Sequence, residues 1–276
     1  MNRNPINQKN IDQAKSKIQQ LKNQFEQRKQ LANALEPIKT KIGVYSGKGG
    51  VGKTSVTINL ALSLNNLGYR TGIFDVDIDC PNVTKALGIN IKPTVDEQDK
   101  MIPPEQHGIK VMSMGFFQKN EDEAIIFRGP MIHNAINQLL SGTNWRDIDI
   151  LLVDLPPGTS DAPLTVMQTL DLDGFVVVTT PQELAKLDAI RSINMIKKLN
   201  LKVFGVVENM TGGIFGKGAA IEMAEELNLP ILSEISLLGD YSSSYEPTVL
   251  NNPTSQEEFN LLAKNINGII TELSSH

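Results

Sequence analysis

Nine consecutive residues constrain this chain more than any other feature: Ser46 to Thr54 read Ser-Gly-Lys-Gly-Gly-Val-Gly-Lys-Thr. Glycine, four residues, then Gly-Lys-Thr is the spacing of a phosphate-binding loop. The preceding Ile42–Tyr45 is apolar like a buried strand, and Ser55–Leu67 has apolar residues at helical spacing. A loop between such elements points its backbone N–H groups at a polyphosphate. We therefore predict that the chain binds ATP through Gly47, Gly49, Gly50, Val51, Gly52, Lys53, Thr54 and Ser55.

Two side chains of the loop carry more specific predictions. Lys53 is placed to contact the β- and γ-phosphates, and the Thr54 hydroxyl to ligate Mg²⁺. The loop also contains a second lysine, Lys48, which an ordinary phosphate-binding loop does not require. Two neighbouring ammonium groups repel each other until a triphosphate neutralises them. The alternative is that Lys48 is a solvated loop lysine.

Lys-Gly-Gly-Val-Gly-Lys-Thr resembles the deviant Walker A class, which includes MinD, ParA, the nitrogenase iron protein and the Mrp (ApbC, Nbp-type) iron–sulfur carriers. The resemblance implies that Lys48 contacts the nucleotide bound by the other subunit of a homodimer. It also implies a catalytic set of Lys48, Lys53 and Asp77, with Asp77 orienting the attacking water.

The wider sequence predicts an α/β fold with a doubly wound, mostly parallel sheet, because near-continuous apolar strands alternate with helices. Ligands of such sheets bind at the carboxyl ends of the strands. Two acidic segments also begin there, namely Asp75–Asp79 and Asp154–Asp161. Asp154 follows four apolar residues and is predicted to hold Mg²⁺ through a water molecule. Asp75 serves either Mg²⁺ or loop geometry, and Gly158 is predicted to offer its backbone N–H to the γ-phosphate.

The first 38 residues are predicted to be a separate amphipathic helix, with residues 39–276 as the ATPase domain. Apolar residues recur at heptad spacing, and Pro37 ends the pattern. Packing on the ATPase body or a sister subunit, binding a partner and partial disorder all remain open. The stripe consists of Ile11, Ile18, Phe25 and Ala32, with Ala14, Leu21 and Leu35.

Charge, apolar runs and the cysteine count indicate which partners and which cellular compartment to expect. Residues 1–41 hold nine Lys/Arg and three Asp/Glu, whereas the remainder holds 17 Lys/Arg and 28 Asp/Glu. Because the body of the protein is acidic, we expect no nucleic-acid binding. No apolar run is long enough to cross a membrane, and the N-terminus lacks the apolar core of a signal peptide. The single cysteine, Cys80, suits a reducing compartment. These features predict a cytoplasmic protein without a membrane partner.

Five blocks together resemble the Mrp/ApbC/Nbp family in particular. They are Asp77-Ile-Asp-Cys-Pro-Asn82, Arg128-Gly-Pro-Met131, Asp154-Leu-Pro-Pro-Gly-Thr-Ser-Asp161, Thr180-Pro-Gln-Glu-Leu184 with Asp188-Ala-Ile-Arg191, and Gly205-Val-Val-Glu-Asn-Met210. The resemblance implies a slow, cytosolic homodimeric ATPase that carries or helps to insert an iron–sulfur cluster, with assembly or apo-target proteins as partners. It also implies that Asn209 recognises the adenine ring.

One departure from that family concerns the cluster itself. Members that carry a cluster have Cys-x-x-Cys after Glu-Asn-Met, so that two chains supply four thiolates. Here residues 208–218 contain no cysteine, and two copies of Cys80 are a poor match for a four-iron cluster. We therefore predict that the usual cluster site is absent. The alternative function is a MinD/ParA-like ATPase that recruits a protein partner in its ATP-bound dimer.

Overall fold

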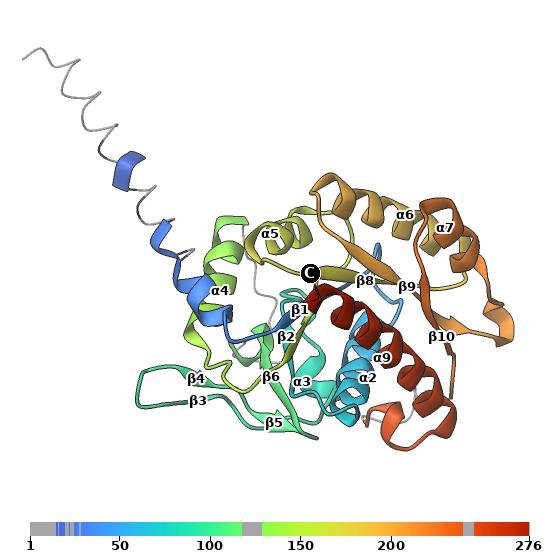
Figure 1. The fold of residues 1–276 in the computed structure, drawn as a ribbon, viewed down its shortest axis with the longest axis horizontal. Coiled ribbons are helices and arrows are strands. Elements are labelled where there is room, and N and C mark those ends of the chain that lie inside the picture. Colours follow the sequence, from blue (N-terminus) through green and yellow to red (C-terminus); the bar gives the residue numbers. More distant parts are fainter. Residues whose placement is uncertain are drawn as a thin grey trace, which may run out of the picture.

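The computed structural model describes residues 15, 17–19, 22, 25–27, 29–117, 129–239 and 246–275. Within them, eight strands form one sheet in the order β10-β9-β8-β1-β7-β2-β6-β5 (Figure 1). All neighbours are parallel except β5 and β6. The strands are β1 (Thr40–Tyr45), β2 (Thr71–Asp75), β5 (Glu105–Gln106), β6 (Ile109–Ser113), β7 (Ile150–Asp154), β8 (Gly174–Thr179), β9 (Val203–Thr211) and β10 (Ile231–Ser236).

Helices cover both faces of this sheet (Figure 1). On one face lie α2 (Lys53–Asn66), α3 (Val83–Ala86) and α9 (Pro253–Ser274). On the other lie α4 (Gly129–Gly142), α5 (Asp161–Thr169), α6 (Glu183–Lys198) and α7 (Ala219–Leu227). The described residues also include three short 3₁₀ turns at Met114–Phe117, Gly213–Phe215 and Thr248–Leu250.

The apolar strands are explained by burial on both faces. Successive side chains of a strand point to opposite sides, and in β7 Leu152 packs into the core beneath α2 and α9 whereas Val153 packs into the core beneath α4 to α7. All five residues of β7 are buried. A strand of this kind needs no polar alternation, so the prediction of a doubly wound, mostly parallel sheet is confirmed.

Most predicted elements are confirmed, with ends shifted by a few residues. The helix expected at 55–67 begins at Lys53, directly on the phosphate-binding loop. Residues 90–107 contain the short strands β3 (Thr94–Val95), β4 (Met101–Ile102) and β5. Strand β6 and helices α4 and α5 were not predicted.

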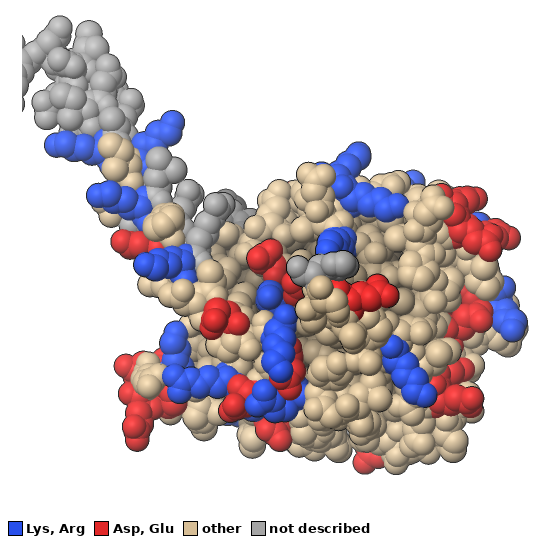
Figure 2. All heavy atoms as spheres, in the orientation of Figure 1, with Lys and Arg blue, Asp and Glu red and all other residues tan. Residues whose placement is uncertain are grey.

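The predicted N-terminal helix lies largely outside the described residues. Residues 29–35 are helical, and Leu31 and Leu35 are buried in the same core as Met167 of α5. Farther toward the N-terminus, Ile18 and Phe25 are 54% and 70% exposed. Figure 2 shows lysine side chains along this segment. The end of the stripe thus packs on the ATPase body, whereas the division at residue 38 stays a prediction.

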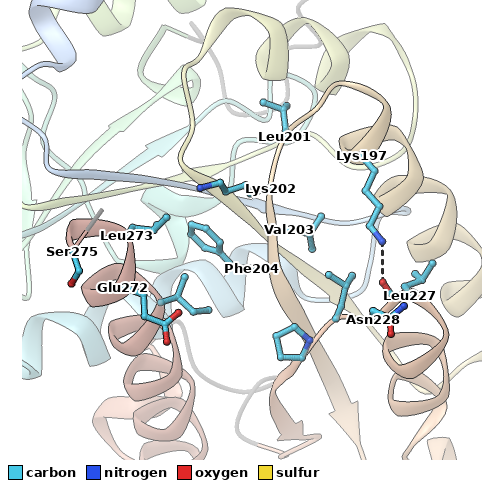
Figure 3. A pocket seen from close by; sticks show the side chains of 13 residues that line it. Lys197, Leu201, Lys202, Val203, Phe204, Leu227, Asn228, Glu272, Leu273 and Ser275 are labelled. Atoms are coloured by element: carbon cyan, nitrogen blue, oxygen red, sulfur yellow. Dashed lines mark hydrogen bonds between the residues drawn. The ribbon is translucent and has the colours of Figure 1, made fainter.

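The amino ends of the strands lie together at the end of the sheet opposite the phosphate-binding loop. An apolar groove there is lined by Val203, Phe204, Leu229 and Leu273, with Lys197 and Glu272 at its margin (Figure 3). At the same edge Asp149 receives two hydrogen bonds from the Arg70 guanidinium, both at 3.0 Å. Among the described residues, no helix combines the length and apolar character needed to cross a bilayer.

Candidate functional site

The predicted phosphate-binding loop joins the end of β1 to the start of α2, as the sequence indicated. Gly50 and Gly52 have φ angles of 80° and 79°, which L-residues with a side chain rarely adopt. A Cβ atom at Gly47 would lie 2.2 Å from the carbonyl oxygen of Asp188 in α6, so a glycine is required for that backbone contact. By contrast, a Cβ at Gly50 would meet nothing within 4 Å. The loop is therefore braced at Gly47 and open at Gly50.

Three side chains from the first turns of α2 converge on Asp154 at the end of β7. The ammonium of Lys53 lies 2.8 Å from Asp154 Oδ1. The hydroxyl of Thr54 donates to Asp154 Oδ2 at 2.6 Å, and that of Thr57 donates to Oδ1 at 2.8 Å. Asp154 is fully buried and Lys53 is 6% exposed. A hydroxyl and a carboxylate both offer oxygen atoms, the kind of ligand that Mg²⁺ takes.

The residues of the first acidic segment have different surroundings. Asp77 lies 3.9 Å from the Lys53 ammonium, and its Oδ1 accepts a hydrogen bond from the Cys80 N–H at 3.2 Å. Burial raises the pKa of Asp77, against the opposing effect of Lys53. Asp77 is therefore the residue of this segment that faces the lysine of the loop.

Asp75 organises the loop around it. Its Oδ1 accepts from the Asp77 N–H at 3.1 Å, and its Oδ2 accepts from the Ser113 hydroxyl at 2.9 Å and the Val83 N–H at 3.3 Å. Burial, and then the charge of Asp154 on the adjacent strand, raise the pKa of Asp75. Asp75 thus holds the geometry of this loop, and its role toward Mg²⁺ stays a prediction.

Gly158 is held by the start of the phosphate-binding loop. Its N–H donates to the Ser46 carbonyl oxygen at 3.0 Å, and its own carbonyl accepts from the Tyr45 hydroxyl. Tyr45 is fully buried at the end of β1, and burial raises the pKa of its phenol to about 12, so it stays a donor. Sequence reasoning missed Tyr45. The only local signal was a hydroxyl-bearing side chain directly before Ser46.

Lys48 has a partner outside the loop. Its ammonium donates to the Gln182 side-chain oxygen at 3.2 Å, across the N-terminus of α6. Gln182 belongs to the Thr180–Leu184 block, but no sequence pattern pairs it with Lys48, which lies 134 residues away. The lysine is thus held by a neutral amide at the exposed side of the loop.

Asn209 and its neighbour connect β9 to two other segments. The Asn209 side-chain amide donates to the Val51 carbonyl oxygen of the loop at 2.8 Å, and Asn209 is 3% exposed. The fully buried Glu208 accepts from the Gly218 and Ala220 N–H groups, both at 2.7 Å, at the start of α7. Cys80 is exposed.

Comparisons with known proteins agree with this geometry. A family model for NUBPL iron-transfer P-loop NTPases of the ParA group matches residues 37–271. An iron–sulfur cluster carrier protein of Methanococcus maripaludis is 43% identical over 224 residues, which make up 77% of this chain and 78% of that protein.

Two solved structures have the same architecture. A nucleotide-binding protein of Archaeoglobus fulgidus, in complex with ADP, is 32% identical with a TM-score of 0.68, over 86% of this chain and 92% of its own. The cell division ATPase MinD of Pyrococcus furiosus has a TM-score of 0.66 at 22% identity, over 84% of this chain and 100% of its own. At this identity the likeness is evidence for the fold alone. On the family match and the 43% identity, this chain belongs to the NUBPL iron-transfer P-loop NTPases, the Mrp/ApbC/Nbp family that its motifs resemble.

Proposed function

We propose that this protein is a slow ATPase that acts as an ATP-dependent homodimeric switch in iron–sulfur cluster assembly. The observation that carries the proposal is the convergence of Lys53, Thr54 and Asp154 where the loop meets α2. The names of the relatives support it, because they describe an iron–sulfur cluster carrier and an ADP complex. The cluster is the cargo of such a switch, and the nucleotide sets its state.

The residues present fit Mg²⁺ and a polyphosphate. Gly50 leaves open space beside the loop, and a hydroxyl and a buried carboxylate stand next to each other in Thr54 and Asp154. Thr54 would hold Mg²⁺ directly, with Asp154 holding it through a water molecule. When bound, Mg²⁺ neutralises charge that develops on the phosphates.

Three groups around the loop, two side chains and one backbone N–H, must exchange partners when a triphosphate binds. Lys53 is paired with Asp154, so its ammonium has to turn from that carboxylate toward the phosphates. Gly158 has to release the Ser46 carbonyl before its N–H can reach a γ-phosphate. Lys48 has to leave Gln182 to reach the nucleotide of a second subunit. Asp77, already beside Lys53, is then the carboxylate that orients the attacking water.

The cargo is not held in the manner of cluster-binding relatives. The chain has one cysteine, so a homodimer offers at most two thiolates, whereas a four-iron cluster requires four ligands. We infer that the ATP-dependent change is read by an assembly protein or an apo-target that holds the cluster itself.

Two variants test the ATPase assignment. Lys53→Ala removes the charge that holds the β- and γ-phosphates, so nucleotide affinity should fall. Asp77→Ala should retain binding and lose turnover, because Lys53 still holds the phosphates whereas the carboxylate that orients water is gone. Asp171→Ala changes an exposed carboxylate at the opposite edge of the sheet and serves as the control. Hydrolysis by Asp77→Ala at the parent rate would show that the water-orienting assignment is wrong.

A further inference from the structure

The side chain of Asn209 reaches the phosphate-binding loop and forms a buried hydrogen bond with its backbone. Its Nδ2 donates to the Val51 carbonyl oxygen at 2.8 Å, over a separation of 158 residues. Both residues are almost completely buried, at 3% and 2% exposure. A buried carbonyl that loses its donor is left unsatisfied, which is costly, so this bond matters for the conformation of the loop.

The bond acts on one peptide unit. The Val51 carbonyl and the Gly52 N–H belong to the same planar trans peptide, in which C=O and N–H point in opposite directions. A donor that holds the carbonyl therefore turns the Gly52 N–H away from Asn209. The N–H groups of a loop of this type are the groups that bind phosphate.

The absence of a side chain at Gly52 allows the Asn209 amide to pack against the loop. A Cβ atom at this position would lie 2.3 Å from Asn209 Nδ2 and 3.2 Å from Met210 Cε. Only a residue without a side chain leaves room for the amide to approach. Glycine is thus required here by space as well as by its φ of 79°.

The strand end that carries Asn209 is fixed from its other side. Glu208 accepts hydrogen bonds from two N–H groups at the start of α7, and Met210 adopts a left-handed φ of 59°, which is uncommon for a residue with a side chain. A conformation of this kind persists only where its surroundings determine it. The Asn209 amide is therefore presented to the loop by a rigid support.

We propose that Asn209 is a positioning residue for the phosphate-binding loop, which orients the Val51–Gly52 peptide so that its N–H binds the polyphosphate. This differs from the adenine contact that the family resemblance implies, because the ligand group served is the phosphate and not the base. The inference rests on the proposed nucleotide-binding function.

The two roles are separated by a ligand that has no base. Displacement of a fluorescent ADP analogue by ADP and by pyrophosphate, both with Mg²⁺, is measured for the parent protein and Asn209→Ala. Loss of one positioning hydrogen bond, about 1 kcal/mol, corresponds to roughly fivefold weaker binding. We expect this factor for both ligands.

Val207→Ala is the matched control. Val207 is fully buried in the same strand, so its truncation also leaves a cavity, but it belongs to the core beneath α2 and α9. Thermal unfolding shows whether the two variants are comparably destabilised. We expect Val207→Ala to bind both ligands as the parent does.

Three outcomes would overturn the inference. If ADP binding weakens while pyrophosphate binding does not, Asn209 acts on the base. If neither changes, the bond to Val51 has no role in binding, and if Val207→Ala weakens binding equally, the effect is general destabilisation. A parent protein that binds neither ligand would instead contradict the proposed function.

Discussion

Gly50 and Gly52 offer a matched pair of substitutions, since their φ angles are 80° and 79°. Replacing either with alanine places a Cβ in a left-handed conformation, at a cost of about 1–2 kcal/mol. The entropy that alanine removes from the unfolded chain is also the same for both. The two variants therefore differ mainly in what the new methyl group meets.

The structure gives the size of that difference. The methyl of Gly50→Ala enters open space, whereas that of Gly52→Ala lies 2.3 Å from Asn209 Nδ2. Overpacking costs about 1–3 kcal/mol, and displacement of the amide from the Val51 carbonyl about 1 kcal/mol more. We expect Gly52→Ala to be less stable than Gly50→Ala by about 2–4 kcal/mol.

The assay is thermal and urea unfolding of both variants without nucleotide. For a domain of this size, a difference of 2 kcal/mol corresponds to a separation of about 4–8 °C in Tm. Adding Asn209→Ala to Gly52→Ala should recover part of the loss, because the clashing amide is then absent. Equal stability of the two glycine variants would refute the tight packing between the loop and Asn209.

Three further predictions concern dimerisation, iron and acid stability. With ATP and an Asp77→Ala background that prevents hydrolysis, light scattering should show a dimer, and Lys48→Ala should leave a monomer that still binds ATP; equal dimer fractions would contradict the role of Lys48. Anaerobic reconstitution with iron and sulfide should leave little iron, unchanged by Cys80→Ser, whereas a stable dimer with about four irons that Cys80→Ser abolishes would restore a resident cluster. The hydrogen bonds from Arg70 hold the pKa of Asp149 below its usual range, so this carboxylate stabilises the fold above its unfolded pKa of about 3.9 and loses that contribution as the pH falls. Urea unfolding at pH 7 should therefore give Asp149→Asn a free energy of unfolding about 1.5–3 kcal/mol below that of the parent, and this difference should shrink toward pH 3. A difference that does not depend on pH would contradict the ion pair between Arg70 and Asp149.

The parts of the site that the sequence predicted are those with a local pattern. The glycines of the loop, Lys53 and Asp154 follow from spacing and from the rule that parallel strands end at one edge. Helix α5 was missed because it is only nine residues long and contains Pro163, which weakens the helical signal. The predicted loop lysine and magnesium ligand do lie together, but the sequence did not indicate that Lys53 would be paired with Asp154.

The contacts that sequence reasoning could not find join segments far apart in the chain. Tyr45 and Gly158 are separated by 113 residues, Lys48 and Gln182 by 134, and Val51 and Asn209 by 158. Each is a single hydrogen bond between ordinary polar groups, so no spacing or periodicity announces it. Such bonds become visible only when the sheet order β9-β8-β1-β7 brings the carboxyl ends of these strands together around the loop.

The side chain of Asp154 has two roles, one in the fold and one in the proposed Mg²⁺ site. It accepts from Thr54 and Thr57 and pairs with Lys53, so it fastens the start of α2 to the central strand even without a ligand. Removing one partner of a buried ion pair costs about 3–5 kcal/mol. An inactive Asp154 variant therefore reports loss of the fold as readily as loss of Mg²⁺. Substitution of Asp154 during evolution is therefore restricted for two reasons, the stability of the fold and the binding of Mg²⁺. A relative with another residue here would need changes in α2 before it could recover either of the two.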